Sequence, residues 1–389
     1  MLKSRLCIAF FAFAVGCAPA QKPLTDYVNP MLGTATLWDS VDLGFKPTKR
    51  TWGAEVFPGS SLPNAMVQVS PVTKFHSGAG YQYEDSVIYG FTHTNKGHWN
   101  LCHIPLLPVT GTPTPGDYCS PFSHERESAA PGYYQVFLDR YGVDAQLSST
   151  LRCAFHKYTY PAGAAASLLA DLQRSNEHVR AWDIRKEGDN VFAGWQQTGE
   201  KMYFYAVANR PVTGIEPVVE GDREVRIVRF GEGDGALELR IGFSFVSEKN
   251  ARENLEAEML GKSFAEVRSE ATATWNDLLG RIRVEGGTER EKGLFYSSLY
   301  RSFLWPALRS DVNGEFTDVD GKVINPGFRY YTGPSYWDDY RNKLILLGML
   351  APDVAADVIS SDTDKGEKRG GFMPTFFHGC LLYTSPSPR

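Results

Sequence analysis

The period of the hydrophobic pattern changes once along the chain. From about Tyr27 to Val246, apolar and polar residues mostly alternate, as in "YYQVFLDRYGVDAQLSSTLRCAFHKYTYP" at residues 133–161. Short alternating runs with turn residues between them, roughly every 8–12 positions, are typical of a β-sandwich. Turns are expected at "RYGV", residues 140–143, and, as a Gly-rich hairpin, at residues 231–235. The sequence therefore predicts a large β-sandwich domain over residues 24–247.

Beyond Val246 the spacing of the apolar residues becomes helical. Two capping boxes, Ser263–Glu266 and Thr288–Glu291, indicate where helices begin. The apolar residues expected on the buried faces of these two helices are Val267, Ala271, Trp275, Leu278 and Ile282, followed by Phe295, Leu299 and Phe303. Pro306 is expected to end the second helix.

Two further helices are expected after this point. The third is expected from Ser335 to Pro352 and the fourth from Asp353 to about Ser360. Successive helices without strands between them indicate an all-α domain. We assign residues 248–287 to linker helices and residues 288–379 to the beginning of this domain.

The N-terminal segment has the features of an export signal. Lys3 and Arg5 precede an apolar run from Leu6 to Val15, which is too short to span a bilayer. Residues 1–20 are therefore expected to be a signal peptide, cleaved after Ala20 to give a soluble protein. Alternatively, "AVGC" loosely resembles a lipobox that would make Cys17 a lipid anchor in the outer membrane. Both readings predict an exported protein that is periplasmic, a cell-surface lipoprotein or secreted.

Composition excludes some partners and favours others. A net charge of −5 argues against a nucleic-acid partner. The 8 Trp, 19 Tyr and 23 Phe fit a β-rich core and also provide flat faces on which sugars stack. Outside the signal and the C-terminal tail, the cysteines are Cys102, Cys119 and Cys153, so at most one disulfide is expected.

A histidine-rich loop is the first candidate site. His93, His98 and His103 fall within eleven residues, around "KGHWN" at residues 96–100. His98 and Trp99 on such a loop would suit a sugar, because the indole stacks on the ring while polar groups contact its hydroxyls. Two other readings stay open: a structural role for His93 and His103, and a metal site.

A second candidate site lies in "SYWDDYRNK". Trp337, Asp338 and Arg341 fall at the expected start of the third helix. A carboxylate and a guanidinium at such a position could bind neighbouring sugar hydroxyls. The alternative is a helix cap with a surface salt bridge. The sequence alone does not separate these two roles.

Five segments in this order resemble glycoside hydrolase family 92. They are "YVNPMLGT", "FPGSSLPNAMVQVSP", "GYQYEDSVIYGFTHT", "PGYYQVFLDRYGVDAQLSSTLRCAFHKYTYP" and "SYWDDYR". The resemblance implies an N-terminal β-sandwich joined by linker helices to an (α/α)6 barrel. It also implies a Ca²⁺-dependent, inverting exo-α-mannosidase that acts on α-mannosides of N-glycan or mannan type.

The chain departs from the family pattern at two places. Asn95 replaces a histidine that many members carry, and their Gly-Thr-Gly loop is absent, so the resemblance does not extend to linkage preference. In the family, the catalytic Glu and Asp and the calcium ligands lie in later barrel segments. We therefore assign no catalytic and no metal residue here, and expect an N-terminal fragment. Residues 380–389, "CLLYTSPSPR", are expected to be a non-native tail.

Three other functions fit parts of the sequence. A secreted carbohydrate-binding β-sandwich without catalysis would explain the aromatic residues but not the capped apolar helices. Another (α/α)6 glycoside hydrolase or a disaccharide phosphorylase would share the architecture, although we find no phosphate-binding loop rich in Gly, Ser and Arg. The third is a non-enzymatic surface lipoprotein.

Overall fold

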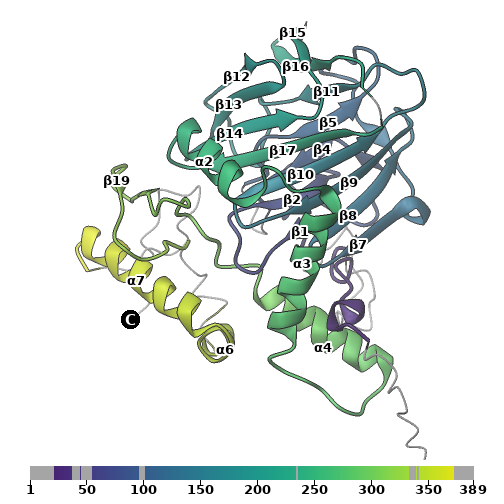
Figure 1. The fold of residues 1–389 in the computed structure, drawn as a ribbon. Helices are drawn as coiled ribbons and strands as arrows, with labels where there is room; N and C mark the ends of the chain where they lie inside the picture. The colour runs from purple at the N-terminus through teal and green to yellow at the C-terminus, as the bar shows by residue number, and fades with distance from the viewer. Residues whose placement is uncertain are drawn as a thin grey trace, which may run out of the picture.

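Two large antiparallel sheets stack on each other and are followed by helices (Figure 1). The computed structural model describes residues 22–36, 44, 55–95, 101–233, 235–332, 339 and 341–371. In spatial order, the seven-stranded sheet contains β1 (Ser60–Ser61), β2 (Gln68–Val72), β4 (Gly90–Thr92), β5 (Leu106–Val109), β11 (Ser167–Ala170), β16 (Arg223–Phe230) and β15 (Val212–Glu220). In the same way, the eight-stranded sheet contains β12 (Ala181–Gly188), β13 (Val191–Gln197), β14 (Lys201–Ala208), β17 (Leu237–Ser244), β10 (Cys153–Thr159), β9 (Val143–Ser149), β8 (Tyr133–Leu138) and β7 (Glu127–Ala130).

Helices and two small sheets complete the described chain. The helices are η1 (Leu24–Tyr27), η2 (His124–Arg126), α2 (Glu248–Glu258), α3 (Phe264–Leu279), α4 (Glu289–Ser302), α6 (Lys343–Leu350) and α7 (Pro352–Lys368). The small sheets pair β3 (Val87–Ile88) with β6 (Ser120–Pro121), and β18 (Phe316–Thr317) with β19 (Val323–Ile324). None of the helices described here is long and apolar enough to cross a membrane.

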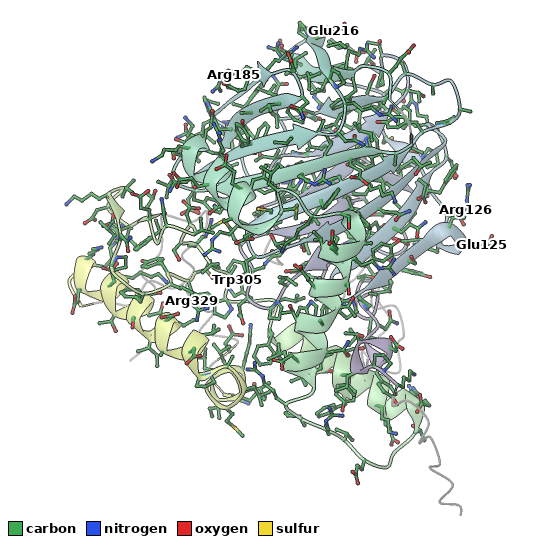
Figure 2. All side chains as sticks on the ribbon, in the orientation of Figure 1. Glu125, Arg126, Arg185, Glu216, Trp305 and Arg329 are labelled. Carbon is green, nitrogen blue, oxygen red and sulfur yellow. The ribbon has the colours of Figure 1, made fainter. Side chains whose placement is uncertain are left out.

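The alternating pattern fills the space between the two sheets. Along β14, every second residue from Met202 to Ala208 is buried, and the residues between them are partly exposed. On the outer surface, charged side chains such as Arg185 and Glu216 project into solvent (Figure 2). The predicted β-sandwich followed by helices is therefore confirmed.

One predicted turn is confirmed and one is wrong. Residues 139–142 connect β8 to β9, which pair directly, with Leu138 opposite Val143, so the turn expected at residues 140–143 is present. Residues 231–235 do not form a hairpin, because β16 and β17 belong to different sheets. The glycines there allow the chain to cross from one sheet to the other. Alternation and glycine spacing indicate a turn but do not determine which strands pair.

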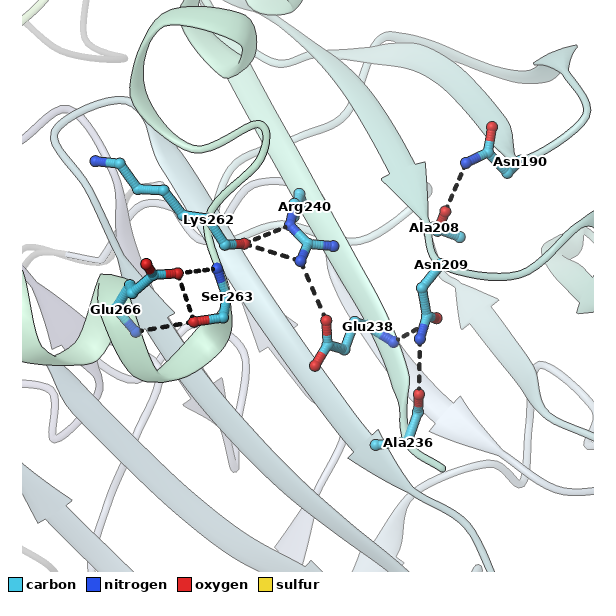
Figure 3. Close-up of polar contacts among 9 residues, drawn as sticks. All are labelled: Asn190, Ala208, Asn209, Ala236, Glu238, Arg240, Lys262, Ser263 and Glu266. Carbon is cyan, nitrogen blue, oxygen red and sulfur yellow. Dashed lines mark hydrogen bonds and ion pairs between the residues drawn. The ribbon is translucent and has the colours of Figure 1, made fainter. Parts of the chain in front are cut away.

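The helix starts follow the capping boxes. Ser263 and Thr288 each accept a hydrogen bond from a backbone N–H three residues later, and both boxes are complete. Arg240 on β17 donates to the carbonyl of Lys262, with N–O distances of 2.9 and 3.1 Å (Figure 3). This contact fixes the first turn of α3 against the sandwich.

The buried helix faces differ partly from those expected. The expected residues of α3 are buried up to Leu278, whereas Ile282 lies beyond the helix end and is only partly buried. On α4, Leu299 and Phe303 are buried, but Phe295 is 36% exposed. Tyr296 packs against Tyr27 of η1, and Tyr300 packs against Trp275 of α3, so these two residues take the buried face of α4 instead.

The last two helices have different bounds from those predicted. Within the expected third helix, Asp339 is helical, residues 341 and 342 form a turn, and α6 begins at Lys343, while residues 333–338 and 340 lie outside the described chain. The fourth, α7, runs to Lys368, well beyond Ser360. Its first helical residue is Pro352, a favoured residue at that position.

The three cysteines outside the signal and the tail form no disulfide. Cys102, Cys119 and Cys153 are all free thiols. Burial raises the pKa of Cys102 to about 12, so this thiol remains protonated and unreactive at neutral pH. The three cysteines therefore leave the sandwich without a covalent crosslink.

Candidate functional site

The base of the histidine-rich loop contacts the segment that follows α4. Asn95 and Leu101 form a β-bridge across the ends of residues 96–100. Leu101 packs in one apolar cluster with Trp305 and Ala307. Trp305 lies where the sandwich meets the helical part of the chain (Figure 2). The loop therefore begins and ends at the boundary between the two parts.

The chain that leads into the second candidate cluster contacts the same segment, at Ala307. The backbone N–H of Thr332 donates to the carbonyl of Ala307 at 2.8 Å, and its Oγ1 accepts from the Ala307 N–H at 2.9 Å. Thr332 is the last described residue before residues 333–338. Segments more than 200 residues apart are thus joined through Trp305–Ala307. We call Leu101, Trp305, Ala307, Arg309 and Thr332 the junction.

Most of the predicted site side chains fall outside the described residues. These are His98, Trp99, Trp337 and Asp338. Arg341 is described, and it is an exposed turn residue two positions before α6. The expected placement of Arg341 inside a helix is therefore wrong. The prediction that these five residues contact sugar is untested by the geometry.

The other two histidines of the loop region have structural hydrogen bonds. His93 Nε2 lies 3.0 Å from His156 Nε2, and His156 Nδ1 lies 2.6 Å from the Tyr158 hydroxyl. His103 sits between two threonine hydroxyls, Thr94 at 2.7 Å and Thr198 at 3.0 Å. Burial lowers the pKa of His93 to about 3 and that of His103 to about 4. Both side chains are therefore neutral parts of the core at physiological pH.

The positions of His93 and His103 do not support a metal site in the histidine-rich region. In the part of the chain that the structure describes, no three His, Cys, Asp or Glu side chains gather so that they could hold a metal ion. Both ring nitrogens of His103 have protein partners, and His93 Nε2 pairs with His156. His98 lies outside this part of the chain.

Buried charged groups at the junction were missed by the sequence analysis. Arg309 is buried, stacks on Phe245 with its guanidinium carbon 3.6 Å from the ring centroid, and pairs with Glu200 at 2.8 Å. Burial lowers the pKa of the Arg309 guanidinium. No local pattern marks Arg309 or Glu200, because they come from irregular segments more than 100 residues apart.

A buried lysine lies on the helical side of the junction. Lys365 on α7 donates to the carbonyl of Tyr331 at 2.8 Å and to Asp362 at 3.0 Å. Desolvation lowers the pKa of this ammonium group, and the positive charge of Arg309 lowers it further. Buried charges of this kind concentrate at functional sites more often than elsewhere.

Asp311 fixes the segment that carries the junction. Its carboxylate accepts hydrogen bonds from Ser244 at 2.6 Å, Asn250 at 2.9 Å and Asn254 at 2.7 Å. Burial raises the pKa of Asp311 to about 6, although these three donors oppose that shift. The segment after α4 is thus attached to both β17 and α2.

Two family models match nearly the whole described chain. Residues 27–253 match the N-terminal domain of glycosyl hydrolase family 92, and residues 250–380 match its catalytic domain. The structure is similar to a family GH92 α-mannosidase from Bacteroides thetaiotaomicron, with a TM-score of 0.82 and 26% identity. That superposition covers 92% of this chain and 51% of the mannosidase.

Further relatives agree with this match. An inverting GH92 mannosidase from Bacteroides thetaiotaomicron has a TM-score of 0.78 and 25% identity, covering 92% of this chain and 51% of that chain. An uncharacterized secreted glycosidase from Arthroderma benhamiae is 24% identical over 344 residues, covering 74% of this chain and 42% of the fungal protein. The chain thus spans about half the length of these relatives. The similarity confirms a large β-sandwich domain followed by helices.

Proposed function

The chain belongs to glycosyl hydrolase family 92, so we propose that the protein removes α-linked mannose from the ends of glycans. The observation that carries this proposal is structural similarity to an α-mannosidase over 92% of the chain, with a TM-score of 0.82. The same mannosidase has also been solved with mannoimidazole. A mannoside is therefore the substrate class that we infer here.

The mechanism we propose is inverting hydrolysis. One similar enzyme is named an inverting mannosidase. Inversion needs a general acid and a general base on opposite sides of the sugar, with their carboxyl groups ~6.5–9.5 Å apart. We assign neither role to a residue of this chain. The part proposed for the junction is to hold the sandwich loop and the helical segment at fixed positions around the sugar.

Calcium dependence is a separate proposal that rests on the family resemblance. The described residues do not fit a calcium site, because no three of their His, Cys, Asp or Glu side chains come together. Ca²⁺ would need six to eight oxygen ligands. We therefore derive no step that involves the ion.

The function is tested by sugar release from the full-length gene product. We expect mannose to be released from α-linked mannobiosides, with the β-anomer appearing first in NMR spectra recorded during hydrolysis. Excess chelator should abolish the release, and added Ca²⁺ should restore it. Hydrolysis of non-mannose glycosides alone would refute the substrate class, and full activity in chelator would refute calcium dependence.

Asp338 provides a test of the predicted sugar contacts. If Asp338, with Trp337 and Arg341, binds sugar hydroxyls, Asp338→Ala in the full-length gene product should lower kcat/KM ~10²-fold, as loss of a charged hydrogen bond would. Asp353→Ala is a matched control, because Asp353 is an exposed acidic residue in the first turn of α7. Equal, small effects of both variants would return Asp338 to a capping role.

We also propose that the protein is exported. The signal-like residues 1–20 support this, and the fungal relative is named a secreted glycosidase. A lipid anchor on Cys17 remains a finer proposal. Membrane fractionation of the wild-type protein and of Cys17→Ala distinguishes an anchored protein from a soluble exported one.

A further inference from the structure

A cavity of about 960 Å³ opens on the sandwich beside the junction. Its walls come from residues 74–76, from residues 173–182 and from the start of β16. Ser175, which lines it, donates a hydrogen bond from Oγ to the carbonyl of Leu101 at 2.7 Å. One wall of the cavity is thus attached directly to the base of the histidine-rich loop.

Positive charge is concentrated in this cavity. The charged residues that line it are Lys74, Arg174, Arg180 and Arg223, with Glu177 as the carboxylate among them. The protein as a whole carries a net charge of −5, so this excess is local. A concave surface lined mainly by one sign of charge attracts ligands of the opposite sign. We call it the cationic cavity.

Two of these arginines are held in place from behind by a buried carboxylate. Asp171 has no solvent-exposed surface, and its Oδ2 lies 2.6 Å from Arg223 and 3.6 Å from Arg174. The Tyr118 hydroxyl donates to the same oxygen at 2.6 Å. One carboxylate balances only one of the two guanidinium groups. The pair therefore presents a net positive charge in a preorganised geometry.

Aromatic side chains form the remaining walls. The guanidinium carbon of Arg174 lies 5.4 Å from the ring centroid of Tyr89 and 5.7 Å from that of Phe75. Trp182 lines the cavity from β12 and is only partly buried. Aromatic faces beside hydrogen-bond donors suit a ligand with both an apolar face and polar groups, which describes a sugar ring. A small inorganic anion needs neither these faces nor this volume.

We propose that the cationic cavity binds a sugar bearing an oxyanion, either a phosphate ester or a carboxylate. The arginines bind the anionic group, and Trp182 contacts the ring. Glu177 lines the cavity and accepts a hydrogen bond from the backbone N–H of Gly199, the residue before Glu200, which pairs with Arg309. If the proposed function holds, the cationic cavity favours glycans that carry an anionic group. The binding itself does not depend on hydrolysis.

Calorimetric titration of the full chain tests the proposal. The probes are mannose 6-phosphate, mannuronic acid, neutral mannose and inorganic phosphate. We expect at least one anionic sugar to bind tenfold or more tightly than both mannose and inorganic phosphate, and to weaken as salt rises from about 50 to about 500 mM. Whether the ester or the uronate binds identifies the source of the oxyanion.

Variants at the cavity rim separate specific binding from general attraction. Lys74 and Arg180 are exposed, so Lys74→Glu with Arg180→Glu should preserve the fold and weaken the anionic sugar at least tenfold. Trp182→Ala should weaken the sugar but not inorganic phosphate. Lys186→Glu is the matched control, because Lys186 is an exposed residue of β12 outside the cavity.

Several results would overturn the proposal. They are no binding of either anionic sugar, binding of mannose as tight as theirs, binding of inorganic phosphate as tight as theirs, and an equal loss with Lys186→Glu. None of these results involves mannose release. Failure of this proposal is therefore distinguishable from failure of the proposed function.

Discussion

Trp275→Ala should lower the free energy of unfolding by ~3–5 kcal/mol, the range for removal of a large buried aromatic side chain. Trp275 has no exposed surface, and its indole N–H donates to the carbonyl of Ser61 at 2.7 Å. Its ring centroid lies 4.4 Å from that of Tyr300 on α4. One side chain therefore connects α3, α4 and the first strand of the sandwich. Urea unfolding followed by circular dichroism measures the loss.

The matched control for this variant is Phe295→Ala. Phe295 was expected to face the core with Leu299 but is 36% exposed, so its removal should cost less than ~1 kcal/mol. A loss for Phe295→Ala as large as that for Trp275→Ala would mean that the buried face of α4 has been assigned incorrectly. The pair of variants thus tests the orientation of the helix as well as the strength of its packing.

Local chemistry explains which elements could be predicted from the sequence. The starts of α3 and α4 were predictable because Ser263 and Thr288 bond to residues three positions away. The period-two pattern predicted the sandwich because the burial of alternate residues is a local property of a strand. Both signals act over a few residues, and sequence alone displays such signals directly.

Contacts between distant segments explain what could not be predicted. The expected hairpin at residues 231–235 failed because strand pairing depends on distant partners: β17 pairs with β10 and β14. Phe295 was misplaced because the orientation of α4 follows from Tyr27, whose ring lies 5.6 Å from that of Tyr296. These contacts join residues from 31 to 269 positions apart, and no local spacing signals them.

The junction illustrates the same limit at the candidate site. Sequence analysis selected two clusters by residue type, and the structure joins their bases through Trp305 and Ala307. Arg309, Glu200 and Lys365 were missed because each is an ordinary charged residue in its own segment. Only the folded chain pairs Arg309 with Glu200 and buries Arg309 and Lys365. Residue type in the sequence points to candidate loops. Burying a charged group costs free energy, so buried charges such as Arg309 and Lys365 are candidates for a role, and only the structure shows that they are buried.

Acid should destabilise the sandwich strongly, because its histidines are buried in the neutral state. Burial lowers the pKa of His93 to about 3 and of His103 to about 4, and lowers the pKa of His156 well below its usual value. An unfolded histidine has a pKa of ~6.5. As pH falls below ~6.5, the unfolded state binds protons that the folded state excludes, so stability decreases. The decrease continues until the folded-state values are reached, near pH 3 to 4.

The size of this effect is roughly 3–5 kcal/mol for each of His93 and His103, at ~1.4 kcal/mol per unit of pKa difference. His103→Gln should retain hydrogen bonds to Thr94 and Thr198 while removing one titrating group. Urea unfolding between about pH 7.5 and about pH 4.5 should then show a pH dependence shallower by up to one proton. His178→Gln, at an exposed position, serves as the control and should leave the dependence unchanged.

A wild-type stability that is flat across this range would contradict the neutral buried state of these imidazoles. An undiminished slope in His103→Gln would instead assign the acid sensitivity to His93 and His156, whose ring nitrogens lie 3.0 Å apart and cannot both be protonated without repulsion.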